Sequence, residues 1–339
     1  MTILNTIKPE FQTAFPRLAS GKYVHFLMVR HSQSFPVFQT DGVLNTARTQ
    51  AGITTQEAIS RLVMFKRKQV SPERLVGREL LRSLNLIDSE DKKVENFCRY
   101  GAEQFCGKCP DCVIYGFAVG DSGSERSKVY SDSAFSLSVY QESHKSFTFN
   151  SLSESGTMML DYDDPKRSES NKVRSSINEL DHILPEITFP TVETLRDPTY
   201  EGFLYVLGNL MRTRRYGAQE SRTGTMANHI IGIALCDGEI FSNLHFTQAL
   251  YDALKPDINA PIADILNKAT EVTTNLLNQE PIRKTQVITG SQLHDLLSEV
   301  ATIYQDETQL RDTLNTLYQQ TKVYAETYGA IAGKKGKGK

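Results

Sequence analysis

The pattern of hydrophobic and polar positions predicts strands and helices in alternation over the first two thirds of the chain. Residues 22–30 (KYVHFLMVR) are rich in β-branched and aromatic side chains, which is typical of a buried strand. Residues 71–85 begin at a Ser-Pro pair and carry leucines spaced for one helix face, and residues 198–214 have the same spacing. Residues 227–236 (ANHIIGIALC) predict a second buried strand.

Two long polar segments interrupt this pattern. Residues 31–56 form a polar, glycine-containing excursion, and loops of that length in a compact domain are usually functional or mobile. Residues 128–140 then alternate imperfectly, as a strand would. Residues 141–178 are rich in Ser, Glu, Asp and Lys, with strand candidates at 146–150 and 157–162. We interpret this last segment as a protruding hairpin or flexible insertion.

The final third of the chain is predominantly helical in pattern. Between residues 246 and 329 the leucines recur at helical spacing, which predicts helices that pack a core rather than bind a cofactor. Residues 330–339 end in GKKGKGK, and we expect them to form a mobile basic tail.

Composition narrows the class of protein. The 339 residues include 38 Lys+Arg and 40 Asp+Glu, a formal net charge of −2. This near-neutral balance excludes a protein that binds nucleic acid by bulk charge alone, although local clusters remain able to do so. No stretch approaches the roughly 18 apolar residues of a membrane span, and the first residues lack a secretory signal pattern. We expect a cytoplasmic protein without membrane contact.

Four of the five cysteines lie close together in the sequence: Cys98, Cys106, Cys109 and Cys112. The C-x2-C spacing lets two thiolates chelate one ion, and four thiolates form a closed tetrahedral zinc site. We therefore predict a structural zinc rather than a catalytic one. A redox-active CxxC pair, an iron–sulfur cluster and unliganded thiols are the alternatives, and the spacing fits each of them less well.

Two basic clusters stand out from the neutral background. The first comprises Lys66, Arg67, Lys68, Arg74, Arg78 and Arg82, and the second comprises Arg212, Arg214, Arg215 and Arg222. The second cluster includes the sequence YGAQESRTG, where Tyr216 could stack on a base and the glycines permit close approach to phosphate. A solvated charged face is the alternative for each cluster, and arginines at a helix end also suit the helix dipole.

Evidence for enzyme chemistry is thin. The sequence contains no P-loop, no G-x-G-x-x-G after a strand, no G-x-S-x-G and no H-E-x-x-H. Asp41 could hold a divalent ion or act on a phosphodiester, although the Asp-Gly pair is first of all a turn signal. The seven histidines form no recognisable pair, and we expect His229, inside an apolar strand, to be a core residue.

Four segments, taken in order, resemble the RAMP superfamily of CRISPR proteins, and specifically the backbone subunits of type I-D surveillance (Cascade) complexes. These segments are residues 70–82 (VSPERLVGRELLR), 105–116 (FCGKCPDCVIYG), 127–137 (SKVYSDSAFSL) and 212–224 (RTRRYGAQESRTG). They resemble a strand-to-helix element, a cysteine-bearing segment, a Ser-basic-Val-x-x-Asp strand and an arginine- and glycine-rich loop. Val76 stands where relatives commonly carry a guide-binding lysine, so this role would pass to Arg74 or Arg78.

The resemblance implies an α+β fold. Its centre would be an RNA-recognition-motif-like (ferredoxin-like) palm with a β-α-β-β-α-β core, over residues 22–245. Large insertions would lie at residues 31–66, 96–116 and 141–178, the second binding zinc and the third forming a thumb hairpin. Residues 246–329 would form a helical region.

The resemblance also implies a function. The chain would be a non-enzymatic CRISPR subunit that binds guide RNA, oligomerises along it and supports target recognition in antiviral defence. Its partners would be the guide RNA, the target nucleic acid paired to it, copies of itself and the other subunits of the complex. The predicted RNA-binding residues are Lys66, Arg67, Lys68, Arg74, Arg78, Arg212, Arg214, Arg215, Tyr216 and Arg222. The alternatives are a metal-dependent target-RNA nuclease that uses Asp41, and a zinc-stabilised protein-interaction module.

Overall fold

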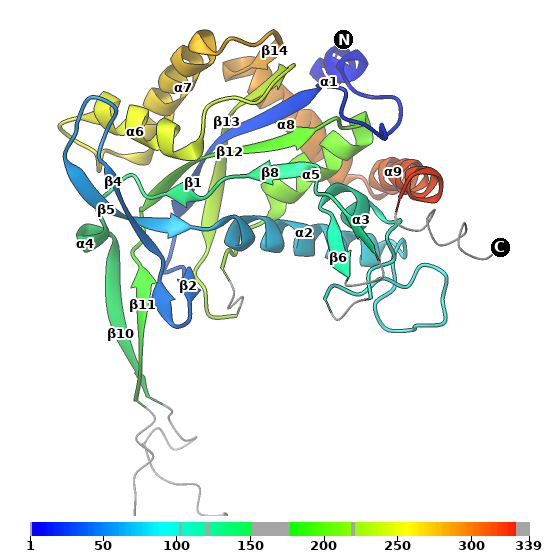
Figure 1. Ribbon diagram of the computed structural model, residues 1–339, viewed down its shortest axis with the longest axis horizontal. Coiled ribbons are helices and arrows are strands. Elements are labelled where there is room, and N and C mark those ends of the chain that lie inside the picture. Colours follow the sequence, from blue (N-terminus) through cyan, green and yellow to red (C-terminus); the bar gives the residue numbers. More distant parts are fainter. Residues whose placement is uncertain (1, 102–103, 120–122, 151–176, 218–220, 330–339) are drawn as a thin grey trace, which may run out of the picture.

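A five-stranded antiparallel sheet forms the centre of the computed structural model (Figure 1), which describes residues 2–101, 104–119, 123–150, 177–217 and 221–329. The strands lie in the order β14 (Lys284–Ile288), β13 (Met226–Cys236), β1 (Tyr23–Ser32), β12 (Thr188–Arg196) and β8 (Val129–Ser131). The neighbouring strands β1 and β12 are buried along nearly their whole length, which agrees with the apolar run of β1.

Two helices complete the central unit: α2 (Lys66–Ser83) and α5 (Tyr200–Arg212). Along the chain the unit is β1-α2-β8-β12-α5-β13, with β13 and β12 on either side of β1. The α+β class predicted from the sequence is confirmed, and this element order agrees with a β-α-β-β-α-β core. Gly77 lets α2 pack closely against α5, because a Cβ at this position would collide with Tyr205 and Asn209.

Helices cover both faces of the sheet (Figure 1). Phe26 and Met28 of β1 face a core shared with α2, α5, α8 (Gly290–Gln305) and α9 (Glu307–Thr327). Leu27 and Val29 point to the opposite side, toward α6 (Asn243–Leu254) and α7 (Ile262–Gln279). The alternation follows from the two-residue period of a strand. Among the described helices, none is both long and apolar enough to cross a membrane.

The polar excursion after β1 folds into short hairpins. It comprises β2 (Gln39–Thr40), β3 (Val43–Leu44), β4 (Thr46–Gln50) and β5 (Ala58–Met64), and β9 (Ala134–Phe135) pairs with β5. The remaining short elements are α1 (Ile3–Ile7), the 3-10 helix η1 (Lys8–Glu10), α3 (Pro110–Ile114), β6 (Phe117–Val119), β7 (Gly123–Glu125) and α4 (Tyr140–Ser143).

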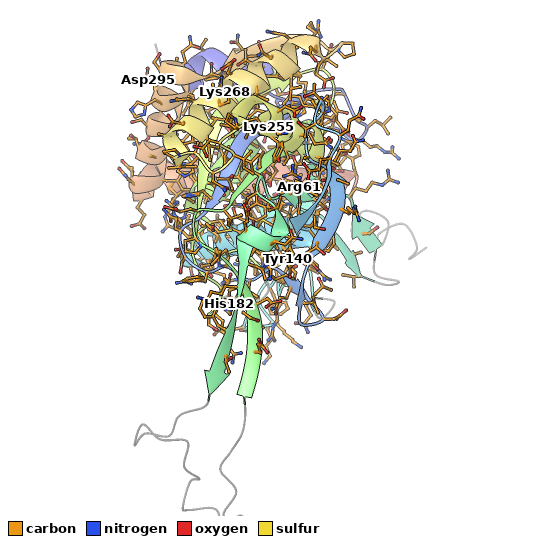
Figure 2. All side chains as sticks on the ribbon, turned by 90° about the vertical axis from the view of Figure 1, so that its left-hand side faces the viewer. Arg61, Tyr140, His182, Lys255, Lys268 and Asp295 are labelled. Carbon is orange, nitrogen blue, oxygen red and sulfur yellow. The ribbon has the colours of Figure 1, made fainter. Side chains whose placement is uncertain are left out.

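A two-stranded ribbon projects from the body of the molecule. Its strands are β10 (His144–Asn150) and β11 (Ile177–Ile183), which pair antiparallel. Figure 2 shows Tyr140 and His182 near the root of this ribbon. The strand predicted at 157–162 lies outside the described residues, as do the middle of the predicted thumb and the basic tail at 330–339.

Three predicted elements need correction. The helix predicted at 71–85 begins at Lys66, so Pro72 lies inside it rather than in its first turn. The strand predicted at 128–140 is divided into β8 and β9. The final third contains the edge strand β14 among its helices. This strand was not predicted, because its five residues carry only a weak alternating pattern.

Candidate nucleic-acid interface and metal centre

The four clustered cysteines are brought together in space. Their Sγ atoms all lie within 4.8 Å of one another. Cys98 Sγ lies 3.8 Å from Cys109 Sγ and 3.6 Å from Cys112 Sγ, and Cys106 Sγ lies 4.0 Å from Cys112 Sγ. Zinc–sulfur bonds of about 2.3 Å in a tetrahedron give sulfur–sulfur distances of about 3.8 Å, whereas a disulfide bond is about 2.0 Å. The spacing fits four ligands around one metal ion.

Backbone amides orient two of these sulfurs. The N–H groups of Lys108 and Cys109 donate to Cys106 Sγ at 3.4 and 3.3 Å, and the Cys106 N–H donates to Cys98 Sγ at 3.4 Å. Gly107 makes this turn with a φ of 72°. Hydrogen bonds from Cys106 and the other two thiols, together with the charge of Arg78, lower the pKa of Cys98. The surroundings therefore favour a thiolate at Cys98.

Arg74 and Arg78 connect α2 to the cysteine segment. Asp111, at the start of α3, is fully buried and accepts hydrogen bonds from Arg74 Nε at 2.9 Å and from Arg78 Nη1 at 2.7 Å. Arg78 also approaches Cys98 Sγ at 3.4 Å and has no exposed surface, and Arg74 is 8% exposed. Both arginines, predicted to bind RNA, therefore lie beneath the surface, where they hold the cysteine segment against the helix.

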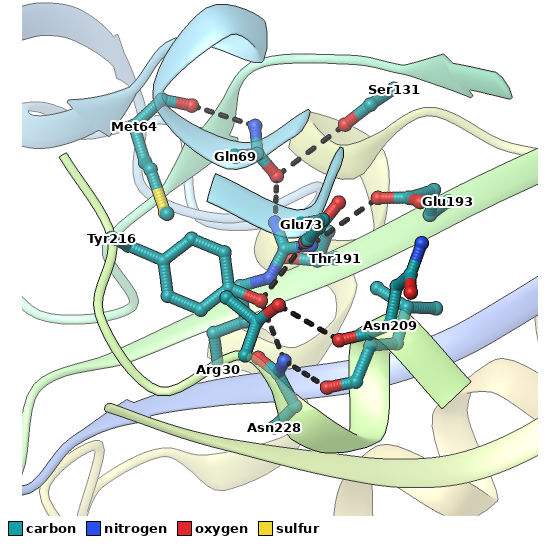
Figure 3. A network of polar contacts seen from close by, with 12 residues as sticks. Arg30, Met64, Gln69, Glu73, Ser131, Thr191, Glu193, Asn209, Tyr216 and Asn228 are labelled. Carbon is teal, nitrogen blue, oxygen red and sulfur yellow. Dashed lines mark hydrogen bonds and ion pairs between the residues drawn. The ribbon is translucent and has the colours of Figure 1, made fainter. Parts of the chain in front are cut away.

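A buried polar network fixes the first half of α2 on the sheet (Figure 3). Arg30 of β1 lies 2.6 Å from Glu73 of α2 and 3.4 Å from Glu193 of β12. Gln69 accepts a further hydrogen bond from Arg30. Burial and the Glu73 carboxylate raise the pKa of Glu193 well above its usual range. Two carboxylates therefore face one guanidinium, and the charge of each carboxylate disfavours ionisation of the other.

Tyr216 ties the arginine-rich loop to the same network. Its hydroxyl donates to Glu73 at 2.9 Å and accepts from Asn228 Nδ2 at 2.6 Å (Figure 3). The ring lies 5.0 Å from the Arg30 guanidinium and is fully buried. Tyr216, predicted as a base-stacking residue, is therefore part of the core in this structure, where no base can reach it.

Pro72 creates a second attachment for the loop. A proline has no N–H, so the carbonyl group of Lys68, four residues earlier, lacks its usual helical donor. The N–H of Gly217 donates to that carbonyl at 3.4 Å. The Ser-Pro sequence first interpreted as a helix start thus marks the place where the loop meets α2.

These attachments bring the loop that carries the second basic cluster against the start of α2. Lys66 and Arg67 are exposed at the start of α2, whereas Lys68 is 7% exposed and burial lowers its pKa. In the second cluster, Arg212 is exposed at the end of α5, 6.0 Å from the Tyr304 ring, and Arg214, Arg215 and Arg222 are exposed in the loop. Within the described part of the chain, none of the six exposed side chains forms an ion pair. We call these six residues the basic surface.

Two exposed aromatic side chains that the sequence did not single out border this surface. Phe65, which precedes α2, is 44% exposed, and Phe35, whose carbonyl accepts from Gly224 N–H in the loop, is 37% exposed. The sequence signal was weak, because each stands beside apolar residues, from which its exposure could not be distinguished.

Asp41 and the histidines lie elsewhere. Asp41 is exposed in the β2–β3 turn with a φ of 54°, which agrees with the turn signal. Over the described ranges, the cysteine set is the only group of three or more potential metal ligands, so Asp41 belongs to none. His229 is half-buried rather than in the core, and its ring lies 5.8 Å from that of His31, a contact that the sequence pattern did not indicate.

Comparisons with known proteins complete these observations. The family model described as Csc2 Crispr matches residues 10–314. The crystal structure of Thermofilum pendens Csc2 aligns with a TM-score of 0.65 and 15% identity, over 100% of this chain and 99% of that chain. A chain from a structure described as a CRISPR RNA-guided surveillance complex aligns with a TM-score of 0.46 and 12% identity, over 79% of this chain and 88% of that chain. No curated protein matches the chain. At these identities, the likeness to the Thermofilum chain is one of fold.

Proposed function

The chain belongs to the Csc2 CRISPR family, and on that premise we propose that it is a guide-RNA-binding backbone subunit of a type I-D surveillance (Cascade) complex of the RAMP superfamily. Copies of the chain stack along one guide in the cytoplasm, beside the other subunits, and hold the guide for pairing with target nucleic acid in antiviral defence. The proposal is a scaffold role without catalysis.

The convergence of the two basic clusters is the observation that carries this proposal. Lys66 and Arg214 are far apart in the sequence, yet the Gly217–Lys68 hydrogen bond brings their segments together. A subunit that accepts any guide must contact phosphate and sugar rather than base edges, and unpaired exposed cations suit that task.

The start of α2 adds to the attraction for phosphate. No side chain caps this helix end, and its first turn contains no acidic residue. The positive end of the helix dipole and the side chains of Lys66 and Arg67 can therefore act on the same anion.

We propose the six residues of the basic surface as the guide contacts. Arg74, Arg78 and Tyr216 take a supporting role in this proposal, because their polar groups are already bonded inside the protein. Lys68 is also largely covered. The proposed contacts thus form a smaller set than the sequence prediction.

We further propose that the four cysteines bind a structural zinc ion. Four thiolates around a divalent ion leave a net negative charge, and Arg78 beside Cys98 offsets part of it. With four protein ligands the site would be closed, so the metal would hold the segment at 96–116 on the palm at 22–245. The insertions at 31–66 and 141–178 would serve as finger and thumb, and the helical region at 246–329 would support the sheet.

Native mass spectrometry of the full chain with its guide RNA tests the proposal. We expect several copies of the chain on one guide, each with one zinc ion. A chain that purifies free of RNA and binds none when it is added would contradict the proposal.

A cleavage assay tests the alternative. The guide-loaded assembly is incubated with labelled complementary RNA, and separately with DNA, in Mg²⁺ or Mn²⁺. We expect intact target in both cases. Regularly spaced products that disappear in Asp41→Ala would instead establish a nuclease.

A further inference from the structure

Tyr100 is an exposed aromatic residue at the edge of the cysteine segment, and the proposed function does not yet use it. Its side chain is 40% exposed. Its ring lies 4.8 Å from the Arg74 guanidinium and meets the Phe105 ring edge-on at 5.8 Å. Arg74 is fixed by Asp111, and Phe105 stacks on Phe117 at 5.6 Å. Arg74 and Phe105 therefore hold the Tyr100 ring on its protein side, while the rest of the ring faces solvent.

Tyr100 also lies close to the basic surface. Its hydroxyl is 3.5 Å from Ser71 Oγ. Ser71 follows Arg67 by four residues, so the two share one face of α2 and are separated by about one helical turn. Arg99, the residue before Tyr100, is also exposed. An exposed ring thus lies between the cations at the start of α2 and a further cation in the cysteine segment.

Exposed cations next to exposed rings are typical of surfaces that bind single-stranded nucleic acid. Proteins that bind single strands without sequence preference combine cations along the backbone path with aromatic rings on which bases stack. A ring that is already ordered loses little conformational entropy on binding. Phe65, exposed immediately before Lys66, provides a second exposed ring near these cations.

We propose that Tyr100 stacks on a base of single-stranded RNA whose phosphates are held by Lys66 and Arg67. The inference rests on the proposed function and extends the RNA path from the palm onto the cysteine segment. Stacking accepts every base, so it is compatible with guides of any sequence.

The absence of tryptophan from the sequence permits a direct test. Tyr100→Trp in the full chain introduces a single indole fluorophore, which a stacked base quenches. We expect saturable quenching on titration with single-stranded RNA of mixed sequence. Tyr328→Trp is the matched control, because Tyr328 is 50% exposed but follows α9, beside Arg17 and Tyr324. We expect no quenching in the control.

Affinity measurements supply the second readout. Tyr100→Ala should weaken RNA binding by about 5- to 100-fold, the range for one stacked base. Tyr100→Phe keeps the ring and should remain within about twofold of wild type. Zinc content and circular dichroism check that each variant is folded. Should Tyr100→Ala lose its zinc, the quenching of Tyr100→Trp decides the question.

The outcomes separate this inference from the proposed function. If RNA binds with wild-type affinity to Tyr100→Ala and does not quench Tyr100→Trp, the stacking role is wrong while the proposed function stands. If quenching appears with a protein partner but not with RNA, Tyr100 belongs to a protein interface and the inference is overturned. If wild-type protein binds no RNA, both fail together.

Discussion

One face of α2 is exposed in its first half and buried in its second half. Positions 67, 71, 74 and 78 follow one another at helical spacing on the same face. Arg67 is exposed and forms no ion pair with any described residue, whereas Arg74 and Arg78 lie beneath the cysteine segment and bind Asp111. The contrast shows that cover by the cysteine segment, rather than the residue type, decides whether an arginine on this face is buried or exposed.

Loss of the cysteine segment that covers Arg74 and Arg78 should have the largest effect on the structure. Chelation of the proposed zinc ion, or Cys109→Ser, should release the segment at 96–116 and lower zinc to less than about half an equivalent, because structural zinc sites contribute roughly 10 kcal/mol or more. Elemental analysis and limited proteolysis measure both changes. Cys236→Ser, in β13 and away from the cluster, is the control. Full zinc retention in Cys109→Ser would contradict a four-cysteine site.

Arginine substitutions on this face should differ strongly in their effect on stability. Arg78→Ala leaves Asp111 partly unpaired in the core, so it should lower the free energy of unfolding by about 3–5 kcal/mol. Arg67→Ala should change it by no more than about 0.5 kcal/mol. Denaturant unfolding of both variants measures the difference. Equal effects would remove the distinction between the two halves.

Loop arginines should affect RNA binding more than stability, although Arg215 also donates to the Thr223 carbonyl oxygen at 2.6 Å. Replacing Arg214 and Arg215 together by Gln should weaken binding about equally for unrelated guides. The slope of log affinity against log salt should flatten by roughly 1.4, since each phosphate contact on a single strand contributes about 0.7. Arg283→Gln, at β14, is the exposed control. Loss of affinity for only one guide sequence would argue against phosphate contacts.

The buried carboxylate pair predicts a smaller effect, on the pH dependence of stability. The folded-state pKa of Glu193 is raised, so the folded state binds a proton that the unfolded state releases above about pH 4.5. The stability contributed by this proton is complete below that pH and is lost as pH rises toward the folded pKa, by at most about 1.4 kcal/mol per unit. Glu193→Gln should flatten this slope. If wild type instead gained stability from pH 5 to 8 relative to Glu193→Gln, the predicted sign of the pH dependence would be wrong.

Much of the fold follows from local pattern. The apolar runs that became β1 and β13, and the leucine spacing of α5, predicted their elements to within a few residues. The cysteine spacing likewise indicated four ligands that the fold brings together. These features succeed because strand burial, helix periodicity and chelation are all short-range properties of the sequence.

The candidate site was harder to predict because its burial depends on distant segments. Nothing near Tyr216 in the sequence shows that Glu73 and Asn228 enclose its hydroxyl. Likewise, Arg78 differs from Arg67 through its contacts with Asp111 and Cys98, which lie in another segment of the chain. The sequence therefore located the basic and cysteine segments, and the tertiary structure determined which of their side chains face solvent.

The most direct test of the central claim is the affinity of the wild-type chain for several unrelated single-stranded RNAs of guide length over a range of salt concentrations. Our account predicts affinities that agree within about threefold, and a log–log salt slope of up to about −4 if all six cations of the basic surface contact phosphate. Binding that does not depend on salt, or that favours one sequence by more than about tenfold, would contradict it.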